Sequence, residues 1–225
     1  MMIVEGCEIA LMTNSFELEE SAARERAMAL VIERVKAGDN TAFEQIIHCY
    51  QRKIVLVAWR MLGNQEDARD AAQDTFLKAF KYLKSYDTRQ DFSGWLYRIA
   101  VNSCNDIARR RGSVGQFTSF EAEHAAGNFS DLVGRDNLEA QAIKTQERAL
   151  INRALKSLSE KERAAIVLRD LEGYSTNEVA KILGSTQTTV RSQISSARAK
   201  IREFHSRMLV SLRKGAGEKG SKGEF

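Results

Sequence analysis

The sequence predicts an all-α protein in which two small helical domains are joined by a flexible acidic linker, and the second domain contains a helix-turn-helix. Three observations predict this fold. The 225 residues include no proline, apolar residues recur at helical spacing along most of the chain, and one central stretch lacks that spacing. An average chain of this length would carry about eleven prolines, so the residue that most often breaks helices is missing.

Five parts are expected along the chain. They are an N-terminal extension over 1–26, a first helical domain over 27–111, a linker over 112–137, a second helical domain over 138–204, and a basic disordered tail over 205–225. The linker is rich in glycine and serine, and four acids stand in it against the single base Arg135. Such a composition is typical of a flexible connection.

The first domain should hold three or four helices. Apolar spacing places them at about 27–36, 41–62, 65–85 and 92–110. Thr41 and Glu44 have the spacing of a capping box, which would open the second helix, and Gly63 would close it.

The third helix has an acidic side opposite its apolar stripe. At about 100° per residue, Asp67, Asp70, Asp74 and Leu77 fall together and away from Phe76. Carboxylates around an outward leucine suit a basic partner helix. A solvated face explains the same pattern equally well.

The fourth helix combines aromatic, amide and guanidinium groups on one stripe, formed by Trp95, Arg98, Asn102, Asn105 and Arg109. An aromatic ring stacks on an unpaired base with about 1–3 kcal/mol, and cations hold phosphates, so the stripe suits unstacked nucleic acid. A core tryptophan above an exposed polar face is the competing interpretation. The preceding loop, 86–91, could hold an extruded base by its hydrogen-bonding edge, although many loops have this polar composition.

Residues 175–202 predict a helix-turn-helix. Ser175 and Glu178 form a capping-box pair, Gly184 ends the first helix, and Ser185 or Thr186 can cap the second. Polar side chains should face outward from the second helix, at Gln187, Thr188, Arg191, Ser192, Ser195 and Arg198. Seven Lys or Arg and one acid lie between positions 190 and 214, so this helix should enter a DNA major groove. An ordinary hairpin with a solvated basic face is the alternative.

Several classes of protein are disfavoured by composition. No segment has the length of a membrane span, and the N-terminus lacks the order of a signal peptide. Cys7, Cys49 and Cys104 are odd in number and widely spaced, which fits a reducing, cytoplasmic setting. We expect no metal, no cofactor and no catalytic activity, because no catalytic constellation or phosphate-binding glycine loop is present.

Taken together, these segments resemble the small alternative sigma factors of bacteria, of the extracytoplasmic-function type in the sigma-70 family. Residues 67–80 (DARDAAQDTFLKAF) are similar to the polymerase-binding helix of that family. Residues 92–102 (FSGWLYRIAVN) resemble its promoter-melting helix, and 155–202 resemble its second conserved domain.

The resemblance implies a role for each surface. Contact with a coiled coil of the largest subunit of core RNA polymerase would involve Asp67, Asp70, Gln73, Asp74 and Leu77. Single-stranded DNA of the minus-10 element would lie on Tyr86, Asp87, Arg89, Gln90, Trp95, Arg98, Asn102, Asn105 and Arg109. Duplex DNA of the minus-35 element would lie on Gln187, Thr188, Arg191, Ser192, Ser195, Ser196 and Arg198. The linker would thread toward the polymerase cleft, and an anti-sigma partner would hold the protein inactive.

Some positions depart from the family pattern. Ser159 stands where proline is usual, and Thr188 where glycine is frequent. Gln193 and Ser196 stand where arginine is common, so phosphate contacts should be fewer there. Two rivals remain: a stand-alone helix-turn-helix regulator would leave the surfaces of the first domain unexplained, and a nucleic-acid-modifying enzyme would lack catalytic residues.

Overall fold

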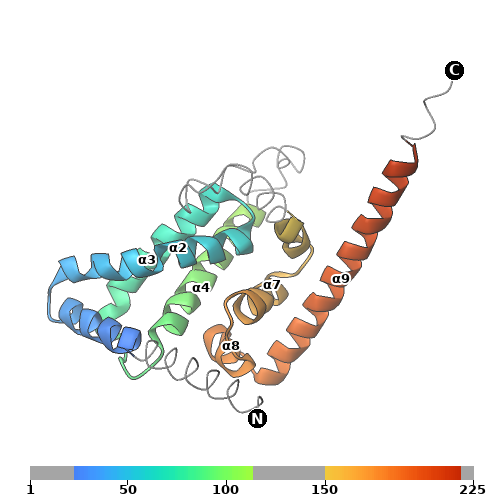
Figure 1. Cartoon of the computed structure of the whole chain (residues 1–225). Coiled ribbons are helices and arrows are strands. Elements are labelled where there is room, and N and C mark those ends of the chain that lie inside the picture. Colours follow the sequence, from blue (N-terminus) through green and yellow to red (C-terminus); the bar gives the residue numbers. More distant parts are fainter. Residues whose placement is uncertain (1–22, 114–149, 219–225) are drawn as a thin grey trace, which may run out of the picture.

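The computed structural model describes residues 23–113 and 150–218, and every regular element within these two ranges is helical (Figure 1). The predicted all-α class is therefore confirmed. Most of the expected linker, the first 22 residues and the end of the expected tail lie outside the described residues.

The N-terminal unit, residues 23–113, is built on three long helices. Its elements are a helix over 23–36, the short 3-10 helix η1 (Asn40–Ala42), α2 (Phe43–Leu62), α3 (Gln65–Tyr82), the 3-10 turn η2 (Leu83–Ser85) and α4 (Phe92–Ser113). The helices α2, α3 and α4 pack against one another and enclose the apolar stripes expected from the sequence.

The C-terminal unit, residues 150–218, contains the helix-turn-helix. Its elements are a helix over 150–156, α7 (Glu160–Ile166), the π-helical turn η3 (Val167–Leu171), α8 (Thr176–Leu183) and α9 (Gln187–Glu218). α7 and α8 pack on the first half of α9, whereas its second half projects away from the rest of the protein (Figure 1). α9 therefore extends through residues 205–218, which were expected to belong to the tail.

Helix ends follow the expected capping chemistry at most places. Ser159 with Glu162 and Ser175 with Glu178 each form the reciprocal capping box. Gly63 and Gly184 end their helices with φ values of 69° and 60°, in the left-handed region that glycine adopts without a steric penalty.

One expected cap is wrong. Thr41 and Glu44 do not form a capping box at the start of the second helix. Instead the Asp39 carboxylate accepts from the Ala42 amide at 3.2 Å, and the Thr41 hydroxyl donates to that carboxylate at 2.6 Å. The acid two residues earlier competes better because an ionised carboxylate is a stronger acceptor than a hydroxyl.

The hydrophobic core is continuous through both units. Ile54 and Leu96 from the N-terminal unit and Leu168 and Val179 from the C-terminal unit are all fully buried in one cluster. The side of α4 that carries Tyr97 is buried by the C-terminal unit. Two separately folded domains were expected, so the contact between the units is a finding of the structure.

A buried carboxylate fastens α7 to α9. Glu162 accepts from the Ser159 amide at 2.9 Å, from the Ser196 hydroxyl at 2.6 Å and from the Lys200 ammonium at 2.8 Å. These bonds, that of Lys200 foremost, lower the pKa of Glu162 to about 2. The residue is 8% exposed, and donors from Ser159, Ser196 and Lys200 surround its carboxylate.

We predict that the Glu162 carboxylate makes the fold acid-sensitive. Its folded-state pKa of about 2 lies below the ordinary value of 4.5, so its contribution to stability is present above the ordinary value and is lost as the pH falls toward about 2. Urea unfolding followed by circular dichroism across this range should therefore show a smaller pH dependence for Glu162→Gln than for the wild type. Glu203→Gln, at an exposed acid on α9, should keep the wild-type pH dependence, and an unchanged slope in Glu162→Gln would contradict this account.

Candidate nucleic-acid interface

The acidic side of α3 is largely accessible. Asp70 and Gln73 are exposed, and the Leu77 side chain is 63% exposed among them. Asp74 is half-buried and pairs with Lys78 at 2.8 Å. The side of the helix predicted to bind a basic partner thus presents an apolar side chain beside carboxylates.

Asp67 departs from the expected outward position. Its residue is only 7% exposed, and its carboxylate pairs with the Arg111 guanidinium at 2.6 Å. Burial raises the pKa of Asp67 although Arg111 opposes the effect. Helical angles placed Asp67 beside Asp70, but the end of α4 covers it, so Asp67 is not available on the acidic surface.

The loop over 86–91 is organised by its own side chains. Asp87 pairs with Arg89 at 2.8 Å, and hydrogen bonds from Arg89 lower the pKa of Asp87 to about 2. The Asp91 carboxylate caps α4 by accepting from the amides of Ser93 and Gly94 at 3.0 and 2.8 Å. Arg89 and Gln90 remain exposed at the tip.

Tyr86 was predicted to contact DNA, but the structure buries it. It is 5% exposed, and its hydroxyl donates to the Gln90 carbonyl. Its ring packs against Phe92 and Trp95 with centroid distances of 5.4 and 4.8 Å. Tyr86 therefore shapes the loop from below and has little surface to offer a ligand.

Trp95 combines the two interpretations that the sequence left open. It packs on Tyr86 and on Phe92, at 5.5 Å from the latter, yet it remains half-buried and lines a cavity. An indole supported by other rings on one side and open on another can stack on a planar ligand.

The other residues of the α4 stripe differ in solvent exposure. Asn102 and Arg109 are exposed, and Asn105 is half-buried. Arg98 differs from them because its guanidinium donates to the backbone carbonyls of Lys181 and Ile182 at 2.9 and 3.0 Å. In this structure Arg98 is held by α8.

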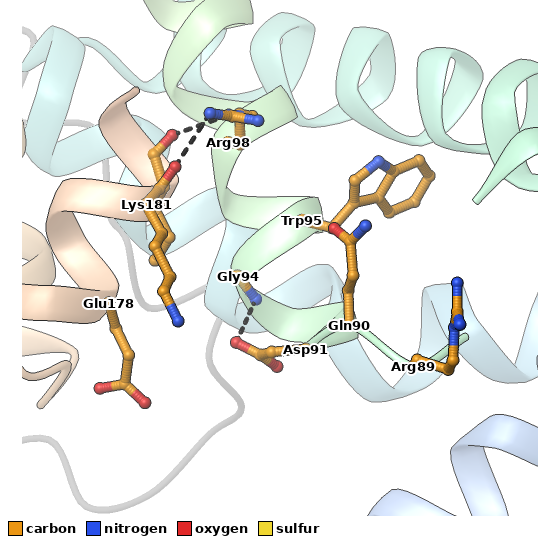
Figure 2. A pocket seen from close by; sticks show the side chains of 9 residues that line it. Arg89, Gln90, Asp91, Gly94, Trp95, Arg98, Glu178 and Lys181 are labelled. Carbon is orange, nitrogen blue, oxygen red and sulfur yellow. Dashed lines mark hydrogen bonds between the residues drawn. The ribbon is translucent and has the colours of Figure 1, made fainter. Parts of the chain in front are cut away.

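A cavity of about 530 Å³ lies where α4 and the loop over 86–91 face α8. Figure 2 shows Gln90 and Trp95 on one side of this space and Glu178 and Lys181 on the other. The sequence indicated the first side. The α8 side could not be expected, since no spacing rule connects residues about eighty positions apart.

The start of α9 presents the predicted polar face. Gln187, Thr188, Arg191, Ser192 and Ser195 are all exposed. Thr186 is the residue that caps this helix, because its hydroxyl accepts from the Thr189 amide at 3.1 Å. Gln187 also donates to Asn177 of α8 at 3.0 Å and accepts from Arg191 at 3.4 Å. All five side chains lie outside the core and can reach a duplex groove.

Two residues assigned to this face are otherwise engaged. Ser196 is half-buried and donates to Glu162 at 2.6 Å, so its hydroxyl is engaged by α7. Arg198 is exposed, but it forms a bidentate pair with Asp170 at 3.0 and 2.7 Å. Position along the helix alone did not show that α7 and η3 would supply these partners.

Two other kinds of feature concern the described residues, a cluster of metal ligands and a membrane-spanning helix. Over 23–113 and 150–218, no group of three or more acidic, histidine or cysteine side chains is arranged to hold a metal ion. No helix in the same ranges has the length and apolarity needed to cross a bilayer.

Two stretches of the chain match models of known families. Residues 46–114 match the model described as Sigma-70 region 2, and 148–201 match the one described as Sigma-70, region 4. They cover the N-terminal unit from α2 onward and the C-terminal unit as far as the middle of α9.

Known proteins match over most of their length. The chain is 33% identical over 174 residues to the RNA polymerase sigma-H factor of Pseudomonas aeruginosa, covering 76% of this chain and 90% of the relative. It is 33% identical over 175 residues to the ECF RNA polymerase sigma factor SigW of Bacillus subtilis, and this match covers 76% of this chain and 93% of the relative. The solved sigma factor RpoE of Bartonella quintana, in complex with the anti-sigma factor NepR, has 27% identity and a TM-score of 0.55 over 73% of this chain and 96% of that chain.

We predict that breaking the Arg198–Asp170 pair increases the affinity for duplex DNA. Asp170→Asn should release the Arg198 guanidinium and remove a negative charge beside it, so this variant should bind a random-sequence duplex more tightly than the wild type does. Each added phosphate contact steepens the dependence of log K on log salt by about 0.9. Fluorescence anisotropy over a salt series measures both effects.

Glu203→Gln is the matched control for this prediction. It raises the net charge equally but removes an acid that pairs with Arg207 farther along α9. Equal gains in the two variants would mean that net charge, and not Arg198, is responsible.

Proposed function

The chain belongs to the extracytoplasmic-function sigma factors of the sigma-70 family, which direct promoter recognition and transcription initiation. We propose a specific role in this function for each of its three exposed surfaces. Its partners in that work are core RNA polymerase and promoter DNA. One observation carries the assignment. The chain matches both sigma regions in order, and it presents an acidic face with an exposed leucine on α3 together with an exposed polar face on α9.

The polymerase would bind on α3. Asp70, Gln73 and Leu77 are exposed there, and the Leu77 side chain can enter a gap between the basic side chains of a coiled coil. Asp74 would contribute while still bonded to Lys78. Asp67 would act indirectly, by fixing the end of α4 through Arg111.

Single-stranded DNA of the minus-10 element would lie along the loop over 86–91 and α4. Trp95 offers a ring face, and Arg89 and Gln90 stand at the rim of the cavity where a base edge would be held. Asn102 and Arg109 continue the strand path along the exposed side of α4. Capture of an unstacked base at this place would favour melting of the duplex.

Duplex DNA of the minus-35 element would meet the start of α9. Arg191 is the best candidate for a bidentate contact with guanine, since it is exposed at the second turn of the helix. Gln187, Ser192 and Ser195 can contact neighbouring base edges or phosphates.

The domain boundaries proposed for this function are those expected from the sequence, 27–111 and 138–204, with the linker passing between them. We also propose that the protein lacks catalytic activity, resides where RNA polymerase does, in the cytoplasm, and has an anti-sigma partner. The solved Bartonella quintana sigma factor, which is bound to such a partner, supports the last point. A stand-alone regulator would have no use for the α3 surface.

Transcription with sigma-free core polymerase and a promoter library tests this function. We predict transcripts with defined starts for the wild type. Asp70→Arg should abolish both transcription and polymerase binding, because it places a cation against a basic coiled coil. Binding is measured by co-elution.

Charge reversal at a distant exposed acid, Glu203→Arg, serves as the control and should leave transcription intact. Circular dichroism should show unchanged helicity in both variants. DNA binding by the wild type that ignores polymerase, without transcripts, would favour the stand-alone regulator.

We predict that Arg191→Ala weakens binding to the upstream promoter element by about 1–3 kcal/mol if the guanidinium contacts a base. The loss should be concentrated on duplexes that carry the element, because a base contact is sequence-specific. Anisotropy with the mapped element and a scrambled duplex measures it. An equal loss on both duplexes would assign Arg191 to a phosphate instead.

A further inference from the structure

A chain of hydrogen bonds joins the two helices of the helix-turn-helix on their exposed side. α8 lies against the start of α9 (Figure 1). Gln187, the first residue of α9, donates from Nε2 to Oδ1 of Asn177 in α8 at 3.0 Å. The Oε1 of Gln187 accepts from Nη2 of Arg191 at 3.4 Å. All three residues are exposed, so the chain of bonds lies on the surface proposed to meet duplex DNA.

Arg191 fixes the direction of these hydrogen bonds. A guanidinium carries only donors, so Gln187 must turn its amide oxygen toward Arg191. The amide nitrogen of Gln187 then points to α8, and the side chain that meets it there must present an acceptor. Asn177 does so with its Oδ1 atom. Removing that acceptor would leave the Gln187 amide held at one end alone.

The Gln187 amide keeps one donor and one acceptor that these two bonds do not use. A side-chain amide has two N–H donors and two acceptor lone pairs, and the bonds to Asn177 and Arg191 take one of each. The remaining donor and acceptor form the pair that adenine requires at N7 and N6 in the major groove. Gln187 is thus prepared to bind adenine in that groove.

Arg191 keeps most of its donors for a second base. A guanidinium has five N–H groups, and the bond to Gln187 uses one of them. Those that remain can donate to O6 and N7 of guanine. Gln187 and Arg191 lie on one face of α9, about 6 Å apart along its axis, whereas bases in a duplex strand rise about 3.4 Å per step. The two side chains can therefore reach bases that are one or two steps apart.

From this geometry we infer that Asn177 is a positioning residue for base recognition by α9. It holds the Gln187 amide so that Gln187 reads adenine and supports the Arg191 guanidinium, which reads a nearby guanine. The inference rests on the proposed minus-35 role of α9 and adds a residue of α8 to it. Hydrogen bonds between exposed side chains contribute little to folding stability. The benefit lies in binding, because side chains that are already ordered lose less freedom on the DNA.

The experiment compares the base preferences of variants. A pool of duplexes with about ten randomised base pairs, one turn of the double helix, is selected by the full chain bound to core RNA polymerase and, in parallel, by the full chain alone. We expect the wild type to enrich adenine one or two steps from guanine. Asn177→Ala should lose the preference for adenine and bind the selected duplex about fivefold more weakly, which is within the cost of ordering one long side chain. Its affinity for a scrambled duplex should stay unchanged.

Three further variants give matched comparisons. Asn177→Asp keeps an acceptor at the same place, so it should keep the adenine preference while its negative charge weakens binding to every duplex. Asn40→Ala removes an exposed amide side chain from the N-terminal unit and should behave like the wild type. Gln187→Ala should lose the adenine preference, and adding Asn177→Ala to it should cost nothing further, because the two residues act as one unit.

The outcomes separate this inference from the proposed function. The inference is overturned if the wild type selects no adenine near guanine, if the adenine preference survives in Asn177→Ala, or if it disappears equally in Asn177→Asp. An equal loss of affinity for the selected and scrambled duplexes in Asn177→Ala overturns it too. In these cases transcription by the wild type still supports the sigma function. A wild type that selects no sequence at all, with or without polymerase, overturns both the inference and the base-reading role of α9. Loss of the preference in Asn177→Ala with its retention in Asn177→Asp supports the inference.

Discussion

The need to satisfy the free backbone groups at helix ends shapes this protein from its local turns to its overall form. Each helix leaves amides at its start and carbonyls at its end without partners. Without proline, the chain ends its helices with side chains and left-handed glycines. Ser159 and Ser175 serve the amide ends locally. Two carbonyl ends are served by arginines from the opposite unit, Arg98 and Arg163, so the same constraint also fastens the two units.

The sequence was informative at most places where partners lie within one helical turn. The boxes at Ser159 and Ser175 and the glycine stop at Gly184 were predicted and are confirmed, since the interacting groups are three or four residues apart. It was misleading where two local solutions compete, and Asp39 takes the role expected of Thr41. The resemblance to sigma factors was confirmed by the family matches, because it rested on two segments in a fixed order.

Candidate site residues were less predictable for a physical reason. Helical spacing gives the angle of a side chain about its own axis, but it does not say what packs there. Asp67 has a suitable angle, and Tyr86 and Ser196 were assigned through the resemblance, yet Arg111, Trp95 and Glu162 cover or engage these three residues. The exposed faces around Leu77 and Arg191 were placed correctly because nothing from the other unit reaches them.

The contact between the two units combines buried apolar surface with hydrogen bonds. Ile182 of α8 is 6% exposed and lies against Gly94 of α4, within a hydrophobic cluster that runs through both units. Arg98 and Tyr97 also donate hydrogen bonds to the C-terminal unit, but the net value of such bonds is small because water can replace the partner. Burial of apolar side chains therefore holds the two units together more than hydrogen bonding does.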